Sequence, residues 1–332
     1  MGIKHLNKYL KTSCKKGILP IDIDTLAGKT IVVDTSIYIY KFLEDNVLLE
    51  NFFIMIIDFR EKNVTPLFVF DGKPNRAKMD VIWKRITNKQ KAKKQYDFWK
   101  EKYEHAENTK SVKHMLWENM ERQRKRSTRV KESDIRELKD LFDALDVFYY
   151  DAPMEADSVC AYFVENSIAW GCMSDDMDMF VYGCNKVIRE WSIEKKCGTL
   201  YDRNQIMKEV RVAPKYFSCL LLVLGSDYHQ DIAEEDKIKI DTAFKWYDEF
   251  QKYETTQQQP AECLYKPPAE CFYNWLKSTN KMKEENAEKL LAIFNMYQIP
   301  EYTYSVSTRQ PVIKWDVVQK IMGPYGFIIS HD

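Results

Sequence analysis

The sequence lacks the features that mark several large classes of protein. Its longest apolar runs, at 52–57 and 219–224, fall far short of the roughly 18 residues that a membrane-spanning helix needs. Ten glycines and 11 prolines in 332 residues exclude collagen-like and low-complexity chains. The N-terminal MGIKHL has neither the apolar run of a signal peptide nor the Ser or Thr of a myristoylation motif. We therefore expect a soluble, globular, intracellular protein with no membrane partner.

No charge of one sign predominates in the whole chain. Fifty Lys and Arg balance 50 Asp and Glu, so no global field attracts a polyanion. The eight cysteines form no CxxC pair, which argues against a zinc ribbon and for reduced thiols.

The charge is nevertheless segregated, because residues 84–131 hold 16 basic and six acidic residues. This segment is either a solvated helical hairpin or a phosphate-binding surface. Its densest cations are Arg122, Arg124, Lys125, Arg126, Arg129 and Lys131.

Short apolar segments that end in a carboxylate predict buried parallel strands, at 30–34 (TIVVD) and 66–71 (PLFVFD). Further strands are expected at 147–150, 169–173 and 186–191. Helical periodicity is found at 37–59 and 133–145. This alternation of strands and helices predicts an α/β fold with a mostly parallel sheet. From about residue 228 the chain becomes acidic, aromatic and helical.

Seven acidic residues follow or interrupt apolar runs. Each one alone could cap a helix or belong to a turn. Together they would repel one another if buried, and a hard divalent cation removes that repulsion. Oxygen ligands favour Mg²⁺ or Mn²⁺, and two such ions about 3.5–4 Å apart are how nucleases hold a phosphodiester. The seven are Asp34, Asp71, Glu155, Asp157, Asp176, Asp178 and Asp227.

Six ordered blocks cover much of the first 228 residues: MGIKHLNKYLK, VVDTSIYIYKFL, FVFDGKPNRAK, YYDAPMEADS, MSDDMD and LLVLGSDY. On these blocks the chain resembles the flap endonucleases and related structure-specific 5′ nucleases. The resemblance implies a PIN-like, Rossmann-like fold, in which helices flank a mostly parallel central sheet. It also implies a nuclease core over 1–228, a basic helical arch at about 84–131, and a divergent, mostly helical C-terminal region over 229–332.

The resemblance also assigns roles to single residues. Two Mg²⁺ ions, which Mn²⁺ could replace, would each have their own ligands. Those of one ion would be Asp34, Asp71, Glu155 and Asp157, and those of the other Asp176, Asp178 and Asp227. The family usually has a glutamate where this chain has Asp157, so one methylene is missing there.

Other matches are to residues that contact the nucleic acid. Lys78 and Arg85 would contact the scissile phosphate, and Tyr40 would stack on a base beside the cut. Gly2 would lie close to the DNA after removal of Met1. Arg126 and Arg129, spaced i and i+3, would share one face of an arch helix.

The match fails after LGSDY, where the family has a glycine-containing hairpin that holds duplex DNA. Here the chain has no glycine and carries Asp231, Glu234, Glu235 and Asp236, which would repel phosphate. We also expect no sliding-clamp peptide, because Gly326 replaces the second aromatic of that motif.

The sequence thus predicts a divalent-metal-dependent nuclease that hydrolyses DNA at flaps, gaps or 5′ ends by a two-metal mechanism, in replication, repair or recombination. The expected partner is branched or 5′-ended DNA, bound by a monomer in the nucleus or cytoplasm. Two alternatives stay open: a DNA-junction binding protein that does not cleave, and a 5′ to 3′ exonuclease on RNA or single strands. The composition would suit a large DNA virus, whose replication site would then be the location.

Overall fold

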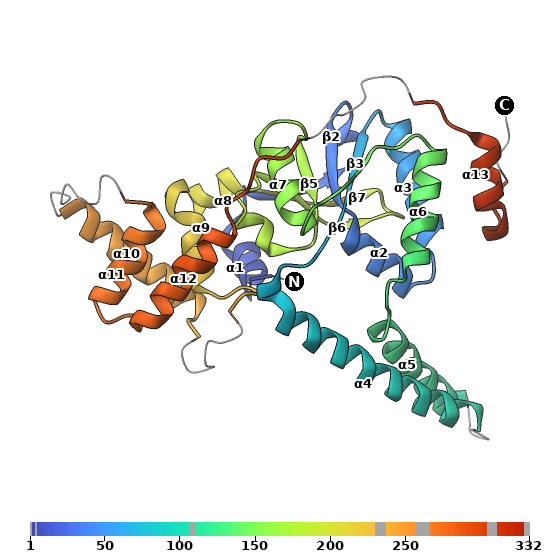
Figure 1. Cartoon of the computed structure of the whole chain (residues 1–332), viewed down its shortest axis with the longest axis horizontal. Coiled ribbons are helices and arrows are strands. Elements are labelled where there is room, and N and C mark those ends of the chain that lie inside the picture. The colour runs from blue at the N-terminus through green and yellow to red at the C-terminus, as the bar shows by residue number, and fades with distance from the viewer. Residues whose placement is uncertain are drawn as a thin grey trace.

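A seven-stranded sheet forms the centre of the molecule (Figure 1). The computed structural model describes residues 2–3, 5–105, 110–229, 237–256, 266–303 and 311–328. The strand order is β1-β7-β6-β5-β2-β3-β4, and only β7 is antiparallel to its neighbours. The mostly parallel sheet is therefore confirmed. The strands are β1 (Ile18–Asp22), β2 (Thr30–Asp34), β3 (Thr65–Phe70), β4 (Tyr149–Asp151), β5 (Gly171–Met173), β6 (Lys186–Ser192) and β7 (Cys197–Asp202).

Successive residues of the central strands point to opposite faces of the sheet, and each face has its own apolar core. Val32 packs into one core, whereas Ile31 and Val33 pack into the other. The Val32 face is covered by α1 (Leu6–Ser13), α7 (Ala156–Glu165), α8 (Arg203–Glu209) and α9 (Pro214–Val223). The opposite face is covered by α2 (Thr35–Glu44), α3 (Leu48–Glu61), α6 (Glu132–Ala144) and α13 (Trp315–Met322).

The predicted helix over 37–59 is wrong as a single element, because α2 and α3 are separated by a turn at 45–47. Asn46 takes a left-handed conformation (φ 56°), which asparagine tolerates better than most residues. The Val47 amide donates to the Phe42 carbonyl and the Asn46 amide to the Leu43 carbonyl, which is the hydrogen-bond pattern of a helix C-terminus. Apolar periodicity continues through this turn and therefore conceals it.

Strands β1 and β7 were also missed by the sequence prediction. They lie at one edge of the sheet, and β1 contains Pro20 and is mostly solvent-exposed. An edge strand needs no continuous apolar run, so its sequence signal is weak. The other five strand predictions are confirmed, with ends that shift by up to two residues.

Two helices project from the body of the molecule as a hairpin, α4 (Met79–Glu104) and α5 (Lys110–Arg126) (Figure 1). The basic segment predicted to form a helical arch is thus a helical hairpin, called the arch below, and its role toward nucleic acid stays a prediction. Arg126 is the last residue of α5 and Arg129 lies beyond it, so the two do not share a helical face as expected. The turn at 127–128 ends the helix, and residues spaced i and i+3 share a face only within a helix.

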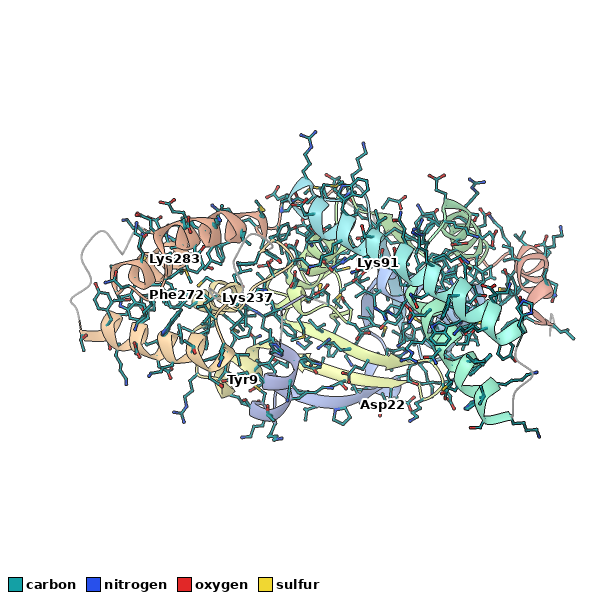
Figure 2. All side chains as sticks on the ribbon, turned by 90° about the horizontal axis from the view of Figure 1, so that it is seen from below. Tyr9, Asp22, Lys91, Lys237, Phe272 and Lys283 are labelled. Atoms are coloured by element: carbon teal, nitrogen blue, oxygen red, sulfur yellow. The ribbon has the colours of Figure 1, made fainter. Side chains whose placement is uncertain are left out.

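The C-terminal region forms α10 (Ile240–Thr256), α11 (Pro268–Ser278) and α12 (Glu284–Met296), which pack with α9. Their buried aromatic residues belong to the same apolar core as Val32. Figure 2 shows Phe272 and Lys283 at this end of the molecule, away from Lys91 of the arch. The division into units at residue 228 stays a prediction.

The last described helix, α13, lies at the other end of the molecule from α10–α12 (Figure 1). Its Val318 and Met322 are fully buried against the α3 and α6 side of the sheet. No helix within the described ranges is both long and apolar enough to span a bilayer.

Candidate active site

The site lies where the carboxyl ends of three neighbouring strands meet. From the central strand β2 the chain continues to β3 on one side, and later enters β5 on the other side. Such a point of reversal opens a crevice at the carboxyl edge of a parallel sheet. Asp34 ends β2, Asp71 follows β3, and the segment with Asp176 and Asp178 follows β5. The sheet topology therefore gathers carboxylates that lie far apart in the sequence.

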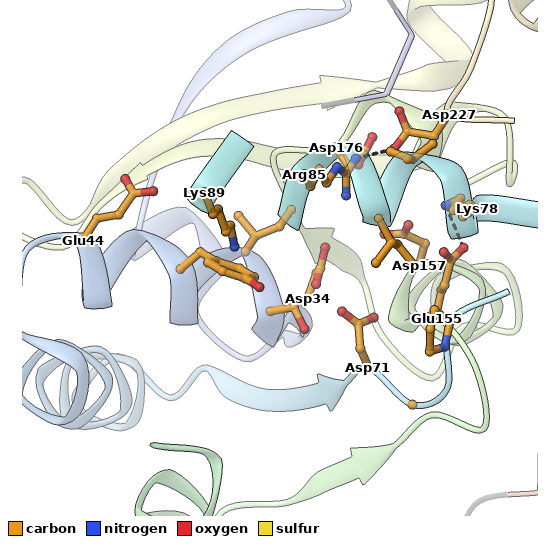
Figure 3. A pocket seen from close by; sticks show the side chains of 17 residues that line it. Asp34, Glu44, Asp71, Lys78, Arg85, Lys89, Glu155, Asp157, Asp176 and Asp227 are labelled. Carbon is orange, nitrogen blue, oxygen red and sulfur yellow. Dashed lines mark hydrogen bonds and ion pairs between the residues drawn. The ribbon is translucent and has the colours of Figure 1, made fainter. Parts of the chain in front are cut away.

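A cavity of about 530 Å³ opens at this edge (Figure 3). Helix α4 of the arch and Lys78, which directly precedes it, form one wall. Lys78 and Arg85 face the carboxylates, whereas Lys89 lies over the Tyr40 ring. Tyr40 of α2 also lines the cavity and is 38% exposed. Six of the seven predicted acidic residues line it: Asp34, Asp71, Glu155, Asp157, Asp176 and Asp227.

Asp71 and the start of α7 are fixed to each other by the backbone. The Ala156 amide, in the first turn of α7, donates to Asp71 Oδ1 at 2.8 Å. This contact places Glu155 and Asp157, at the same helix terminus, beside Asp71. A Cβ at Gly72 would overlap the Ala152 carbonyl oxygen, so only glycine allows this approach.

Ser174 connects two of the carboxylates. Its hydroxyl donates to Asp34 Oδ2 at 3.0 Å and accepts from the Asp176 amide at 3.2 Å. The residue is completely buried. The sequence analysis assigned no role to Ser174, although it lies inside the MSDDMD block.

Asp178, the seventh acidic residue, lies behind the cavity and is 1% exposed. Its amide donates to Asp176 Oδ1 at 2.9 Å, and its Oδ2 accepts from the Tyr297 hydroxyl at 2.6 Å. Its Oδ1 has no hydrogen-bond partner among the described residues. A Cβ at Gly2 would overlap Asp176 Oδ1 and Asp178 Oδ1, which places Gly2 against these carboxylates.

Burial and mutual repulsion raise the pKa of several of these carboxyls. Burial, reinforced by the charge of Asp71, raises the pKa of Asp34 well above its usual value. Burial and the charge of Asp34 do the same for Asp157. Burial and the charge of Asp176 raise the pKa of Asp178 to about 7. The cluster is therefore short of positive charge, and added cations would stabilise its ionised form.

Two cations already neutralise part of the cluster. Lys78 Nζ lies 2.7 Å from Glu155 Oε2, and the Tyr228 hydroxyl donates to the same oxygen at 3.1 Å. Burial alone would lower the pKa of Lys78, but Glu155 and Asp157 outweigh it and raise that pKa. An Nη atom of Arg85 lies 2.5 Å from Asp227 Oδ2 (Figure 3).

These ion pairs draw Glu155 and Asp227 toward α4. In the part of the chain that the structure describes, no three acidic, histidine or cysteine side chains already surround one point closely enough for a metal. The oxygen-only donor set and the unpartnered, buried Asp178 Oδ1 nevertheless fit hard divalent cations.

At the end of the cavity near Glu44, the Lys89 ammonium lies 4.0 Å from the centre of the Tyr40 ring. This distance is typical of a cation–π interaction. It connects α4 to the aromatic ring that was predicted to stack on a base. Lys89 itself was not singled out from the sequence.

The six predicted arch cations do not line the cavity. Arg124 donates to the Glu44 carbonyl at 2.8 Å, and Lys125 forms a 2.6 Å ion pair with Asp45. Both contacts attach α5 to the turn between α2 and α3. The side chains of the other four are exposed: Arg122, Arg126, Arg129 and Lys131.

Two further residues near the carboxylates were missed by the sequence analysis. Tyr228 directly follows Asp227 in the LGSDY block, so its position was available as a signal. Tyr297 lies in the C-terminal region, in the segment NMYQIP, which carries no signal of a role. The acids that were expected to repel duplex DNA, Asp231, Glu234, Glu235 and Asp236, lie outside the described residues.

Comparisons with known proteins agree with this arrangement. The XPG N-terminal domain matches residues 1–92 and the XPG I-region matches residues 146–227, together more than half of the chain. Flap endonuclease 1 of Entamoeba histolytica is 26% identical over 325 residues, covering 88% of this chain and 82% of that protein. Flap endonuclease 1 of Xenopus tropicalis is 30% identical over 250 residues, covering 70% of this chain and 62% of that protein.

Solved structures share the fold. The catalytic core of Rad2 in complex with DNA substrate aligns with a TM-score of 0.64 at 20% identity, over 97% of this chain and 95% of that one. Flap endonuclease-1 from Methanococcus jannaschii aligns with a TM-score of 0.61 at 18% identity, over 93% of this chain and 90% of that one.

Proposed function

Because the chain belongs to the flap endonuclease family with XPG N-terminal and I-region domains, we propose that it is a structure-specific 5′ nuclease that hydrolyses phosphodiester bonds in DNA. One observation carries the proposal. Carboxylates at the ends of β2, β3 and β5, at the start of α7 and after α9 surround a single cavity at the carboxyl edge of the sheet, which Lys78, Arg85 and Lys89 also line. This set of charges suits a phosphodiester with divalent cations.

We assign the carboxylates to two Mg²⁺ ions, which Mn²⁺ could replace. When bound, the ions supply Lewis-acid stabilisation of the charge that develops on the phosphate. One ion is assigned to Asp34, Asp71, Glu155 and Asp157, and the other to Asp176, Asp178 and Asp227. Asp157, which is shorter than the glutamate usual in the family, lies at the start of α7, next to Asp71.

Lys78 and Arg85 are the proposed phosphate-binding cations. Lys78 directly precedes α4 and Arg85 lies in its second turn, and both side chains line the cavity. A fixed cation at this place stabilises negative charge that increases in the transition state. Each forms an ion pair with a carboxylate here, Lys78 with Glu155 and Arg85 with Asp227, and each could turn from that carboxylate to the phosphate.

The arch gives the single-stranded 5′ end a path to the cavity. Tyr40 offers a ring on which a base can stack, and Lys89 of α4 covers that ring. Gly2, beside Asp176 and Asp178, would approach the same DNA. Arg122, Arg126, Arg129 and Lys131 are exposed and available to phosphates, whereas Arg124 and Lys125 hold the arch to the core.

We propose branched or 5′-ended DNA as the partner of a monomer that acts in the nucleus or cytoplasm. Gln319, Met322 and Tyr325, the nearest approach to a sliding-clamp peptide, lie in or next to α13. Because Met322 is buried against the core, this segment is a poor clamp ligand.

The test is cleavage of a 5′-end-labelled flap DNA with Mg²⁺ and with EDTA, alongside a labelled single-stranded RNA. We expect Mg²⁺-dependent cutting near the flap junction. Tight flap binding without cutting would favour a junction-binding protein, and preferential degradation of the RNA would favour an exonuclease on single strands.

A further inference from the structure

Tyr297 joins the C-terminal region to a proposed metal ligand by a hydrogen bond. It follows α12 directly, is 3% exposed, and its hydroxyl donates to Asp178 Oδ2 at 2.6 Å. Residue 297 is 119 positions away from Asp178 in the chain. The contact therefore connects the metal site to a region to which the sequence assigned no function.

The Tyr297 ring is held in place by two other tyrosines. Its centre lies 4.7 Å from that of Tyr182 and 5.4 Å from that of Tyr228, with the Tyr228 pair nearly perpendicular at 83°. Edge-to-face and tilted contacts of this kind stabilise a fixed ring orientation. Tyr228 in turn donates to Glu155. Tyr297 and Tyr228 thus connect a ligand of one proposed metal to a ligand of the other, and Tyr182 supports the Tyr297 ring.

The hydrogen bond from Tyr297 makes the two carboxylate oxygens of Asp178 differ in their surroundings. Oδ2 is occupied by the tyrosine hydroxyl, whereas Oδ1 is buried and has no hydrogen-bond partner in the described ranges. Oδ1 also faces Gly2 and lies on the same side as Asp176 Oδ1. A carboxylate with one oxygen held by a donor presents the other oxygen in a fixed direction to a cation. Such supporting donors strongly affect metal affinity in other proteins.

We propose that Tyr297 is a positioning residue that orients Asp178 for the second metal, so that the C-terminal helices help to set the affinity of the active site for divalent cations. The inference rests on the proposed function, because it needs Asp178 to bind metal. Tyr297 touches neither the phosphate nor the metal. Its hydroxyl acts through Asp178, to which it donates.

The test uses the full chain with Tyr297→Phe, which keeps the ring and its packing and removes the hydroxyl. Mn²⁺ is titrated in the absence of DNA, and the free ion is followed by electron paramagnetic resonance. Loss of a hydrogen bond to a metal ligand typically costs about 10–100-fold in affinity. We expect the affinity for the Mn²⁺ ion held by Asp176, Asp178 and Asp227 to fall about 10-fold. The Mg²⁺ concentration that gives half-maximal flap cleavage should rise by a similar factor. The KM for flap DNA at saturating Mg²⁺ should stay within twofold of wild type.

Tyr273→Phe is the matched control. Tyr273 is also a buried tyrosine of the C-terminal helices, and its hydroxyl donates to the Cys219 carbonyl, away from the carboxylates. The control should bind Mn²⁺ as wild type does. Equal Mn²⁺ affinity in Tyr297→Phe and wild type would overturn the inference, as would a Tyr297→Phe chain that does not fold. A wild-type chain that binds no Mn²⁺ would contradict the proposed function itself, which separates the two failures.

Discussion

Lys78 and Glu155 form a 2.7 Å ion pair in which a cation predicted to contact phosphate neutralises a carboxylate predicted to hold a metal. Arg85 and Asp227 repeat this relationship at 2.5 Å. Under the proposed metal assignment, each carboxylate would have two competing partners, its cation and a divalent ion. We therefore expect an exchange in which metal binding frees the two cations for phosphate.

The exchange predicts that one substitution lowers cleavage without lowering metal binding. Arg85→Ala should lower kcat by about 10²–10³-fold, as expected for the loss of one group that stabilises transition-state charge. Its affinity for Mn²⁺ without DNA should not fall, because Asp227 then has no competing cation. Lys84→Ala is the control, since Lys84 is an exposed neighbour on α4 that does not line the cavity. A parallel loss of Mn²⁺ affinity in Arg85→Ala would contradict the exchange.

Asp176→Ala should abolish cleavage of flap DNA and leave its binding largely intact. Asp176 lines the cavity, and its Oδ1 accepts a hydrogen bond from the Asp178 amide. Removal of the side chain therefore disturbs two ligands of one proposed metal, whereas the arch is unchanged. Cleavage and gel-shift binding are measured on the same flap.

A neighbouring aspartate provides the control for Asp176. Asp175 Oδ1 accepts from the Glu190 amide, away from the carboxylate cluster. Asp175→Asn should keep near-normal cleavage. Normal turnover by Asp176→Ala would end the two-metal assignment.

Much of the fold and most of the cavity could be predicted from the sequence, for a physical reason. Parallel strands are short apolar runs, and a carboxylate at the end of such a run, as in TIVVD, marks the edge of the sheet where ligands bind. Asp34 and Asp71 were therefore visible without the structure, as were the other five acids that follow or interrupt apolar runs, and the resemblance of the ordered blocks assigned all seven to metals.

What could not be predicted depends on contacts between distant segments. Tyr297 meets Asp178 only because α12 packs on the core, and no local pattern encodes that packing. The helix break at Asn46 was concealed because both flanking helices bury the same apolar face. Arg124 looked like its neighbours in a basic run, yet its partners are the Glu44 carbonyl and Asn46, nearly 80 positions earlier.

Arg124 should stabilise the arch, unlike the exposed Arg126 and Arg129 that follow it. Its hydrogen bonds to Asn46 and the Glu44 carbonyl hold α5 against the turn after α2, and a third bond, to Glu121, lies within α5. Bonds from a charged donor contribute about 1.5–3 kcal/mol each, and less where the side chain is exposed. Arg124→Ala should therefore speed amide hydrogen exchange in 110–126 while the exchange of β2 and β3 stays unchanged. Unaltered exchange in α5 would show that this contact does not hold the arch.

Arg126 and Arg129, unlike Arg124, are expected to contribute to DNA binding and not to the stability of the arch. Both are exposed, so changing them together to Ala should leave the exchange of α5 unaltered. Each phosphate contact contributes about 0.9 to the slope of log affinity against log salt concentration. The double variant should therefore bind flap DNA more weakly and lose up to about two units of that slope. An unchanged slope would leave these residues as a solvated surface.

The raised carboxyl pKa values predict how metal and pH act together on stability. A carboxyl whose pKa is higher in the folded than in the unfolded chain binds its proton more tightly when folded. The metal-free protein therefore loses stability as pH rises from about 4, the usual aspartate value, through about 7, the value for Asp178. Asp34 and Asp157 shift in the same direction. Divalent ions bind the ionised carboxylates, so they should restore the folding stability that the protein loses as the pH rises.

The increase in unfolding temperature caused by Mg²⁺ should accordingly be larger at pH 8 than at pH 5.5, as measured by differential scanning calorimetry. Asp178→Asn separates the contribution of Asp178 from that of the other carboxyls, because the amide has nearly the same shape as the carboxyl and does not ionise. Without metal, this variant should lose less stability than wild type between the two pH values. It should also gain less from Mg²⁺ at pH 8. If Mg²⁺ stabilised wild type equally at both pH values, repulsion among these carboxylates would not be what the metal relieves.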